Sequence, residues 1–181
     1  ITVNAPTCSS GSHSAGLEIL NASQVKFTGT GTLTIQIDSA TNQLGSVYGI
    51  YLSRLNINSL CDLTFESGNI IININVTNAC STYGVDTDDA DSIGGNITVE
   101  KGASLTVNIS SNAPYRRTYG LFSNGDINLN GSTNLTMKYT GESMPSHARW
   151  HIQVTGIGCK TTIGVNALVN ASVAEGLPYG F

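Results

Sequence analysis

An acidic stretch is the densest group of side chains that could hold a metal ion. Four carboxylates fall within six residues, at Asp86, Asp88, Asp89 and Asp91. Calcium takes six to eight oxygen ligands from carboxylates and carbonyls, so this stretch is a candidate Ca²⁺ site. The alternative is a solvated acidic loop that its neighbour partly neutralises. The repeat described below places Arg54 one unit away from Asp89, where the two would form an ion pair.

A second stretch combines an aromatic residue with two cations, at Tyr115, Arg116 and Arg117. An arginine can bind the carboxylate of an acidic sugar through two parallel hydrogen bonds. A tyrosine beside it can stack on the sugar ring. These three residues are therefore a candidate polysaccharide-binding group, with a plain surface pair of cations facing the acidic loop as the alternative.

The third stretch holds the only tryptophan of the chain and two of its three histidines, at His147, Arg149, Trp150 and His151. An exposed tryptophan among hydrogen-bonding side chains is a typical ligand platform. The alternative is that Trp150 packs over an otherwise bare edge of the fold. Two histidines four residues apart can share a metal ion on a helix, but no helical pattern is present here.

The motifs of common catalytic sites are absent from the sequence. There is no nucleophile elbow, phosphate-binding loop, dinucleotide fingerprint or H-E-x-x-H pair. Hydrolysis of a glycosidic bond would need two carboxyl groups facing each other across a cleft, and nothing in the sequence indicates such a pair. We therefore expect no catalytic residues and no enzymatic activity, with a polysaccharide lyase or hydrolase fragment as the remaining enzyme hypothesis.

The element that must position these stretches is a short glycine-centred phrase that returns five times. Its glycines are 33, 35, 36 and 36 residues apart, and the phrases are Ala15-Gly16-Leu17, Tyr48-Gly49-Ile50, Tyr83-Gly84-Val85, Tyr119-Gly120-Leu121 and Thr155-Gly156-Ile157. A constant period in this range is typical of stacked structural units. The glycine is expected at a tight corner or at a close approach that leaves no room for a Cβ atom.

Each phrase precedes two short runs in which apolar and polar residues alternate, as in half-buried strands. Three strands per unit, stacked on the same three strands of the next unit, form a continuous interior. The sequence thus predicts an all-β fold, a right-handed parallel β-helix of about five rungs with 33–36 residues per rung. We expect the β-helix to span residues 15–173, with 1–14 as an N-terminal cap or link and 174–181 as a C-terminal cap or tail.

Two of the three candidate stretches, the acidic one and the one with Trp150, coincide with places where a unit is longer than its neighbours. Residues 52–62 and 86–95 add about six residues at the same corner of two successive units, and 142–153 lengthen the fourth unit elsewhere. Repeat proteins often place binding loops at such insertions, because the scaffold holds them firmly.

The four cysteines lack the paired spacing of a metal site. Cys61 and Cys80 fall in one unit and could form a disulfide bond across a corner. Cys8 and Cys159 lie about 19 Å apart along the expected axis, which excludes a bond within one module. They are either free thiols or partners between modules that stack end to end.

Composition limits the classes of partner. The net charge of −4 gives no basic surface for nucleic acid, and no apolar run is long enough to span a membrane. Only 11% of the residues are charged, and the abundant Asn, Ser and Thr of this β-rich chain are typical of proteins outside the cell or on its surface.

One unit resembles a known repeat. Residues 119–139 are similar to rungs of bacterial secreted carbohydrate-binding β-helix proteins, which are related in fold to pectate lyases. The matching positions are Gly120, Gly125, Asp126, Ile127, Leu129, Gly131 and Leu135. The resemblance implies binding of acidic plant polysaccharides with Ca²⁺ at acidic corners, here at Asp126 and the 86–91 stretch.

These observations favour an extracellular, non-catalytic module that binds polysaccharide, with calcium as a candidate cofactor. The alternative is a structural or adhesive surface repeat, or a filament subunit that associates end to end through its open β edges.

Overall fold

The computed structural model describes residues 1–5, 13–20, 24–39, 45–53, 61–76, 81–87, 95–111, 117–139 and 149–175. Its regular elements are fourteen strands: β1 (Thr2–Ala5), β2 (Ser14–Leu20), β3 (Gln24–Phe27), β4 (Thr32–Ser39), β5 (Val47–Ser53), β6 (Asp62–Val76), β7 (Thr82–Asp86), β8 (Ile97–Ser111), β9 (Thr118–Ser123), β10 (Ile127–Leu129), β11 (Ser132–Tyr139), β12 (Arg149–Val154), β13 (Thr161–Ile163) and β14 (Val169–Glu175). The described residues contain no helix that could cross a membrane.

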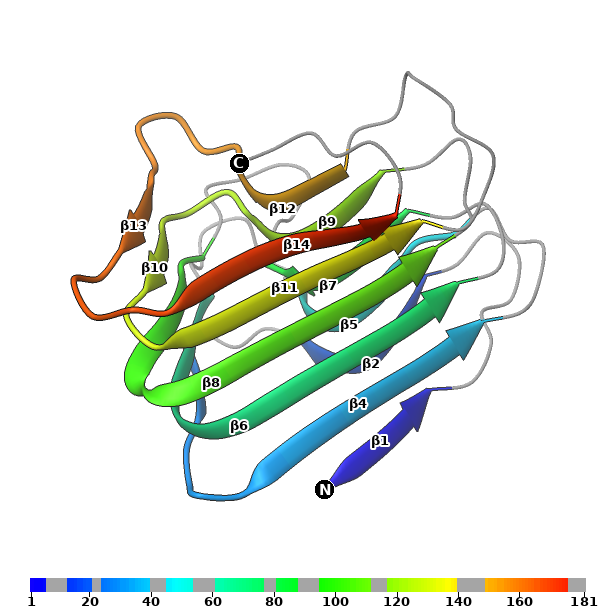
Figure 1. Cartoon of the computed structure of the whole chain (residues 1–181), viewed down its shortest axis with the longest axis horizontal. Coiled ribbons are helices and arrows are strands. Elements are labelled where there is room, and N and C mark those ends of the chain that lie inside the picture. Colours follow the sequence, from blue (N-terminus) through cyan, green and yellow to red (C-terminus); the bar gives the residue numbers. More distant parts are fainter. Residues whose placement is uncertain are drawn as a thin grey trace.

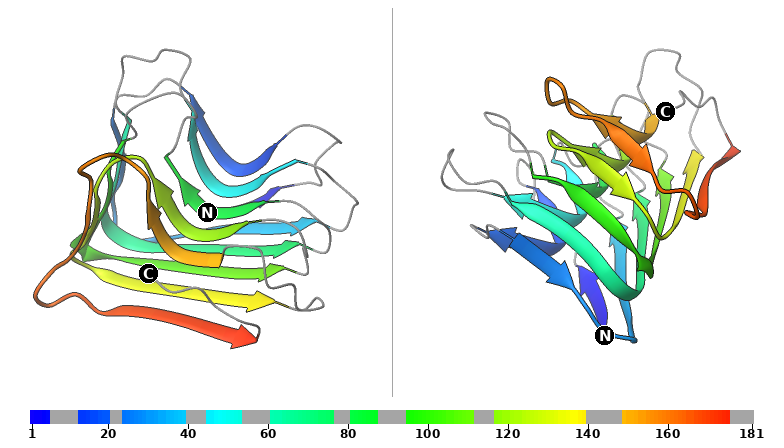
Figure 2. Two further views of the ribbon diagram at one scale, coloured as in Figure 1. Left: turned by 90° about the horizontal axis from the view of Figure 1, so that it is seen from above. Right: turned by 90° about the vertical axis from the view of Figure 1, so that its left-hand side faces the viewer.

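The strands form two parallel sheets that face each other across the core (Figures 1 and 2). The five-stranded sheet has the order β12-β9-β7-β5-β2, so each pass of the chain adds one strand to it. The nine-stranded sheet is bent into two faces. The long strands β6 and β8 continue through the bend, whereas in the other passes two separate strands lie on either side of it, as β3 and β4 do. Gly68 lies at this bend with a φ of 84°, a conformation that favours glycine.

This arrangement confirms the predicted β-solenoid. Five passes contribute to the five-stranded sheet, but only about three form turns with a neighbour on both sides, namely β5–β6, β7–β8 and β9–β11. The number of turns with a neighbour on both sides is thus about three, whereas five rungs were expected, because the first and last passes are the ends of the stack. The right-handed sense of the coil stays a prediction.

The core consists of inward columns in which the same position recurs in every pass. In one column Ile35, Ile72, Val107 and Leu135 lie opposite one another in register, and all four are essentially buried. Alternation along each strand places these residues inside and polar residues outside, as the sequence pattern predicted.

Four of the five repeated glycines lie inside strands and not at corners, namely Gly16, Gly49, Gly84 and Gly120. A Cβ atom on Gly49 would be 2.4 Å from the carbonyl oxygen of Gly84 and 2.3 Å from the side chain of Ile72. The expectation of a close approach is therefore confirmed, whereas the corner position is wrong. Gly49 and Ile50 are both buried, so the alternation shifts by one residue and Tyr48 and Tyr51 both face outward.

The fifth glycine phrase was assigned to the wrong residues. In the register of β12 with β9, Trp150 lies opposite Tyr119 and Ile152 opposite Leu121, which places His151 opposite Gly120. Gly156 lies beyond the end of β12. The last repeat interval is thus 151 − 120 = 31 residues, and it was missed because a histidine replaces the glycine that marks the other passes. Residues 149–153 consequently belong to a strand of the repeat and not to an insertion.

Candidate functional site

The outer face of the five-stranded sheet carries a column of aromatic rings. Tyr48, Tyr83 and Tyr119 occupy the same register position of β5, β7 and β9. Their ring centroids are 4.8 Å and 5.0 Å apart with interplanar angles of 15° and 24°, so the rings are stacked. Trp150 holds the next position of this column in β12. The first position, in β2, is Ala15.

A second outward column runs beside the first and contains Tyr51, Asp86 and Phe122. The Tyr51 ring stacks on Tyr48 at 4.3 Å, and Phe122 lies 4.7 Å from Tyr119. We use the term aromatic ladder for Tyr48, Tyr51, Tyr83, Tyr119, Phe122 and Trp150.

The repeated glycine explains why two outward rings of one strand can meet. Tyr48 and Tyr51 are three residues apart, and two inward residues, Gly49 and Ile50, lie between them. In a regular strand, residues at this separation would point to opposite faces. Figure 2 shows that the strands of this sheet are strongly curved. The glycine in the phrase Tyr-Gly-Ile thus allows the outward side chains of Tyr48 and Tyr51 to contact each other.

A buried carboxylate lies within the ladder. Asp86 is 3% exposed, and its negative charge raises the pKa values of Tyr83 and Tyr119. Burial is the largest cause of the raised pKa at both tyrosines. The positive charge of the Arg117 guanidinium acts in the opposite direction and lowers the pKa of both tyrosines. Arg117 also donates a side-chain hydrogen bond to Tyr119. Asp86, Arg117 and the two phenols therefore form one electrostatically coupled group.

These raised pKa values predict a loss of stability at alkaline pH. The unfolded chain releases phenolic protons near the ordinary pKa of 10.0, whereas folded Tyr83 and Tyr119 still hold theirs. The free energy of unfolding should therefore be independent of these groups below about pH 10 and fall as pH rises further. Urea denaturation across this range should show a steeper fall for the wild type than for Tyr83→Phe. Equal slopes would mean that Tyr83 is not buried in this environment.

At the N-terminal end of the ladder a histidine and a glutamate form an exposed pair. The His13 ring donates from Nε2 to Glu18 Oε1 at 3.1 Å, with side chains 45% and 37% exposed. The same ring meets Tyr48 and Tyr51 edge-on, at centroid distances of 5.9 Å and 5.3 Å. Sequence analysis missed this pair, because it lies in the first pass, where the repeat has alanine in place of tyrosine.

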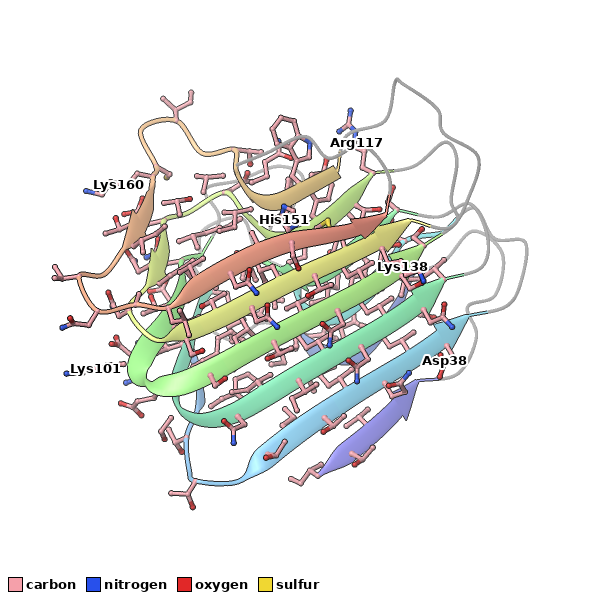
Figure 3. All side chains as sticks on the ribbon, in the orientation of Figure 1. Asp38, Lys101, Arg117, Lys138, His151 and Lys160 are labelled. Carbon is pink, nitrogen blue, oxygen red and sulfur yellow. The ribbon has the colours of Figure 1, made fainter. Side chains whose placement is uncertain are left out.

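Arg117 is exposed at the start of β9, in the position that His13 holds before β2 (Figure 3). The structure thus places one of the three predicted sugar-binding residues beside the ladder. Tyr115 and Arg116 lie outside the described residues.

The predicted Trp150 platform is divided between two sides of β12. Trp150 is half-buried on the outer face, in the ladder column. His151 is 5% exposed and donates from Nε2 to the Ser172 carbonyl at 3.0 Å. Arg149 is the first residue of β12, and His147 lies outside the described part of the chain. His151 is therefore not placed beside Trp150 for ligand binding.

The predicted calcium positions are tested only in part. Asp88, Asp89 and Asp91 lie outside the described residues, and within the described residues no group of three His, Cys, Asp or Glu could hold a metal ion. Asp126 Oδ1 accepts the Lys160 backbone N–H at 2.9 Å. Asp62 and Asn96 make the equivalent bond to the next pass. Asp126 is thus one member of a structural ladder of side chain–backbone bonds.

The predicted disulfide bonds each involve a cysteine that the structure does not describe. Cys61 is buried and Cys159 is half-buried. Cys80 and Cys8, their predicted partners, lie outside the described ranges.

Comparison with known proteins gave no relative: no protein-family model, no curated protein and no solved structure matches the chain. A function for this chain must therefore be argued from its own geometry.

Proposed function

We propose that the chain is an extracellular, non-catalytic module that binds polysaccharide along the outer face of its five-stranded sheet. The observation that carries the proposal is the aromatic ladder, with the exposed His13–Glu18 pair at its N-terminal end and the exposed Arg117 beside Tyr119. Binding sites commonly combine aromatic surface with a few well-placed polar groups. Here the rings supply the surface, and His13, Glu18 and Arg117 supply the polar groups.

The ladder limits how a sugar could lie on it. Its inner rings cover one another and Tyr119 is only 2% exposed, so the ring surface open to a ligand is the edges of the half-buried Tyr48, Tyr51 and Tyr83. Tyr48 is covered as well, by Tyr83 of the next strand and by Tyr51 of its own strand. The His13–Glu18 pair lies beside this ring. We therefore place the sugar contact at the ring edges of Tyr48 and Tyr51, with Glu18 as a hydrogen-bond acceptor for sugar hydroxyl groups.

The opposite part of the face favours an acidic ligand group. Arg117 is exposed, and arginine pairs with a carboxylate through two parallel hydrogen bonds. Three strand spacings, about 14 Å, separate the passes of Ala15 and Tyr119. A ligand that contacts both Glu18 and Arg117 must therefore be an oligosaccharide or polysaccharide. A uronate-containing chain fits this pattern, since it carries hydroxyl groups for Glu18 and carboxylates for Arg117.

Calorimetric titration with a panel of neutral and uronate-containing polysaccharides, with calcium and with chelator, tests the proposal. We expect binding to a uronate-containing member, and about ten-fold weaker binding for Arg117→Ala, since a charge-assisted hydrogen bond contributes about 1.5–3 kcal/mol. Lys101→Ala is the matched control, because Lys101 is an exposed cation at the bend of the nine-stranded sheet. Equal affinities of the two variants would contradict the role of Arg117.

The same titrations separate the enzyme hypothesis from the binding hypothesis. A lyase or hydrolase would shorten the polysaccharide and release new chain ends during the incubation. We expect no such release. A polysaccharide that is cut by the wild type would overturn the non-catalytic assignment.

A further inference from the structure

Among the described residues, both ends of the solenoid present strand edges that pair on one side only. At the C-terminal end these are β12, β13 and β14, and at the N-terminal end β2 and β3. Ile163 and Leu168 at the C-terminal end are 53% and 70% exposed. Unpaired edges beside apolar side chains are templates for association with a second copy of the chain. Two features of the structure oppose this association.

The first feature is the side chain of His151. In β5, β7 and β9 the glycine at this position faces the carbonyl oxygen of the next pass. A Cβ atom on Gly120, for example, would be 2.5 Å from the oxygen of His151. His151 has such a Cβ atom. A further strand on β12 in the same geometry would bring its own carbonyl oxygen against this atom, so the position is closed.

The last pass has room for the His151 side chain because the residue that faces it is small. In the earlier passes glycine is combined with a large residue of the facing column, as in Gly49 with Ile72 and Gly84 with Val107. In the last pass the facing column holds Ala171, and the His151 ring reaches the neighbouring Ser172. A large residue and a small residue have thus changed places.

The second feature is β1. It pairs with β4 in the nine-stranded sheet and thus occupies the position that precedes the first complete pass. Consider a second copy whose β12 pairs with β2 of the first copy. Because β12 and β14 belong to one pass, β14 of the second copy would then have to pair with β4 of the first copy. That position already holds β1. The two ends of the chain therefore overlap by one strand and do not match.

We propose that His151 and β1 are two independent stops, one at each end, that prevent copies of this chain from stacking end to end. The excluded partner is a second copy, joined through β12 and β2. The Cβ atom of His151 sterically blocks a further strand on β12, and β1 already occupies the pairing position on β4.

The test removes each stop alone and both together. His151→Gly with Ala171→Val gives the last pass the pair that Gly84 and Val107 form. Val3→Asp puts a charge on the half-buried residue that packs β1 against the core opposite Ile35. Light scattering after size exclusion, over a wide range of concentrations, measures the mass of each full-length chain, and circular dichroism checks that it is folded.

We expect monomers for the wild type and for each chain with one stop removed. The chain with both stops removed should form oligomers whose mass rises with concentration. Oligomers of the wild type or of a chain that lacks one stop would overturn the proposal, and so would a folded monomer after both stops are removed. If the chain with both stops removed does not fold, the two chains that each lack one stop test the proposal, because it requires both of them to stay monomeric.

A disulfide reporter identifies the contact through which any oligomer forms. In the stacked arrangement Gln153 of β12 would lie opposite Glu18 of β2, since both belong to the outward column of Tyr51 and Phe122. Opposed strands bring Cα atoms within the distance that a disulfide spans. With Glu18→Cys and Gln153→Cys, the chain with both stops removed should form crosslinked ladders under oxidation. Oligomers without this crosslink would show that a different surface is responsible.

Discussion

Gly84→Ala should destabilise the protein by about 3 kcal/mol or more. The new Cβ atom would be 2.5 Å from the Gly120 carbonyl oxygen and 2.3 Å from the Val107 side chain. Overpacking usually costs about 1–3 kcal/mol, and here one of the two obstacles is backbone that a hydrogen-bonded neighbouring strand holds in place. For a chain of this length, such a loss lowers the midpoint of thermal unfolding by about 6–12 °C.

The matched control for this change is Gly31→Ala. A Cβ atom on Gly31 would meet nothing within 4 Å. We expect its free energy of unfolding to lie within about 0.5 kcal/mol of the wild type, as for most surface substitutions. Thermal and urea denaturation of both variants measure the difference. Equal stability of Gly84→Ala and Gly31→Ala would mean that β7 and β9 do not approach as closely as described.

Tyr83→Ala should combine a large loss of stability with a loss of ligand binding. The Tyr83 ring lies between Tyr48 and Tyr119 and also contacts Phe122, so its removal interrupts the ladder at its centre. Truncation of a buried aromatic ring to alanine costs about 3–5 kcal/mol. Tyr83 is half-buried, and we expect the lower end of this range. Tyr48 and Tyr119 would also lose the ring that fixes their orientation.

Tyr83→Phe separates the ring from its hydroxyl group. It keeps the stacked surface, so we expect a stability near that of the wild type at neutral pH and an affinity for polysaccharide within about two-fold of the wild type, since the Tyr83 hydroxyl is not placed at a polar end of the ladder. Urea denaturation and calorimetric titration measure the two properties. If Tyr83→Phe loses as much stability as Tyr83→Ala, the ring stacking is not what stabilises the ladder.

The fold was largely predictable from the sequence because a solenoid repeats its pattern. Each pass places an apolar residue at the same inward position, as in Ile35, Ile72 and Val107, so periodicity alone revealed the stacking. The last pass was misassigned for the same reason. His151 replaces the marker glycine, and only the register of β12 with β9 reveals its position.

The candidate site was predictable only in part. The recurring tyrosines before the glycines were visible in the sequence, and the ring distances show that Tyr48, Tyr83 and Tyr119 form a stack. Their partnership with Tyr51 and Phe122 was not visible, because it depends on the shift of alternation at the glycine, which makes residues three apart point the same way. His13 and Glu18 were missed because a pair across five residues has no marker in the repeat.

The most direct test of the central claim, that the aromatic face of the five-stranded sheet binds polysaccharide, uses the fluorescence of Trp150. It is the only tryptophan of the chain and occupies the last position of the ladder column, beside the strand that follows Arg117. We predict a saturable change in its emission on titration with a uronate-containing polysaccharide. Arg117→Ala should need about ten-fold more ligand, and Lys101→Ala should match the wild type. Binding that leaves the emission of Trp150 unchanged and is equally tight for Arg117→Ala would contradict the account, as would the absence of binding to every polysaccharide of the panel.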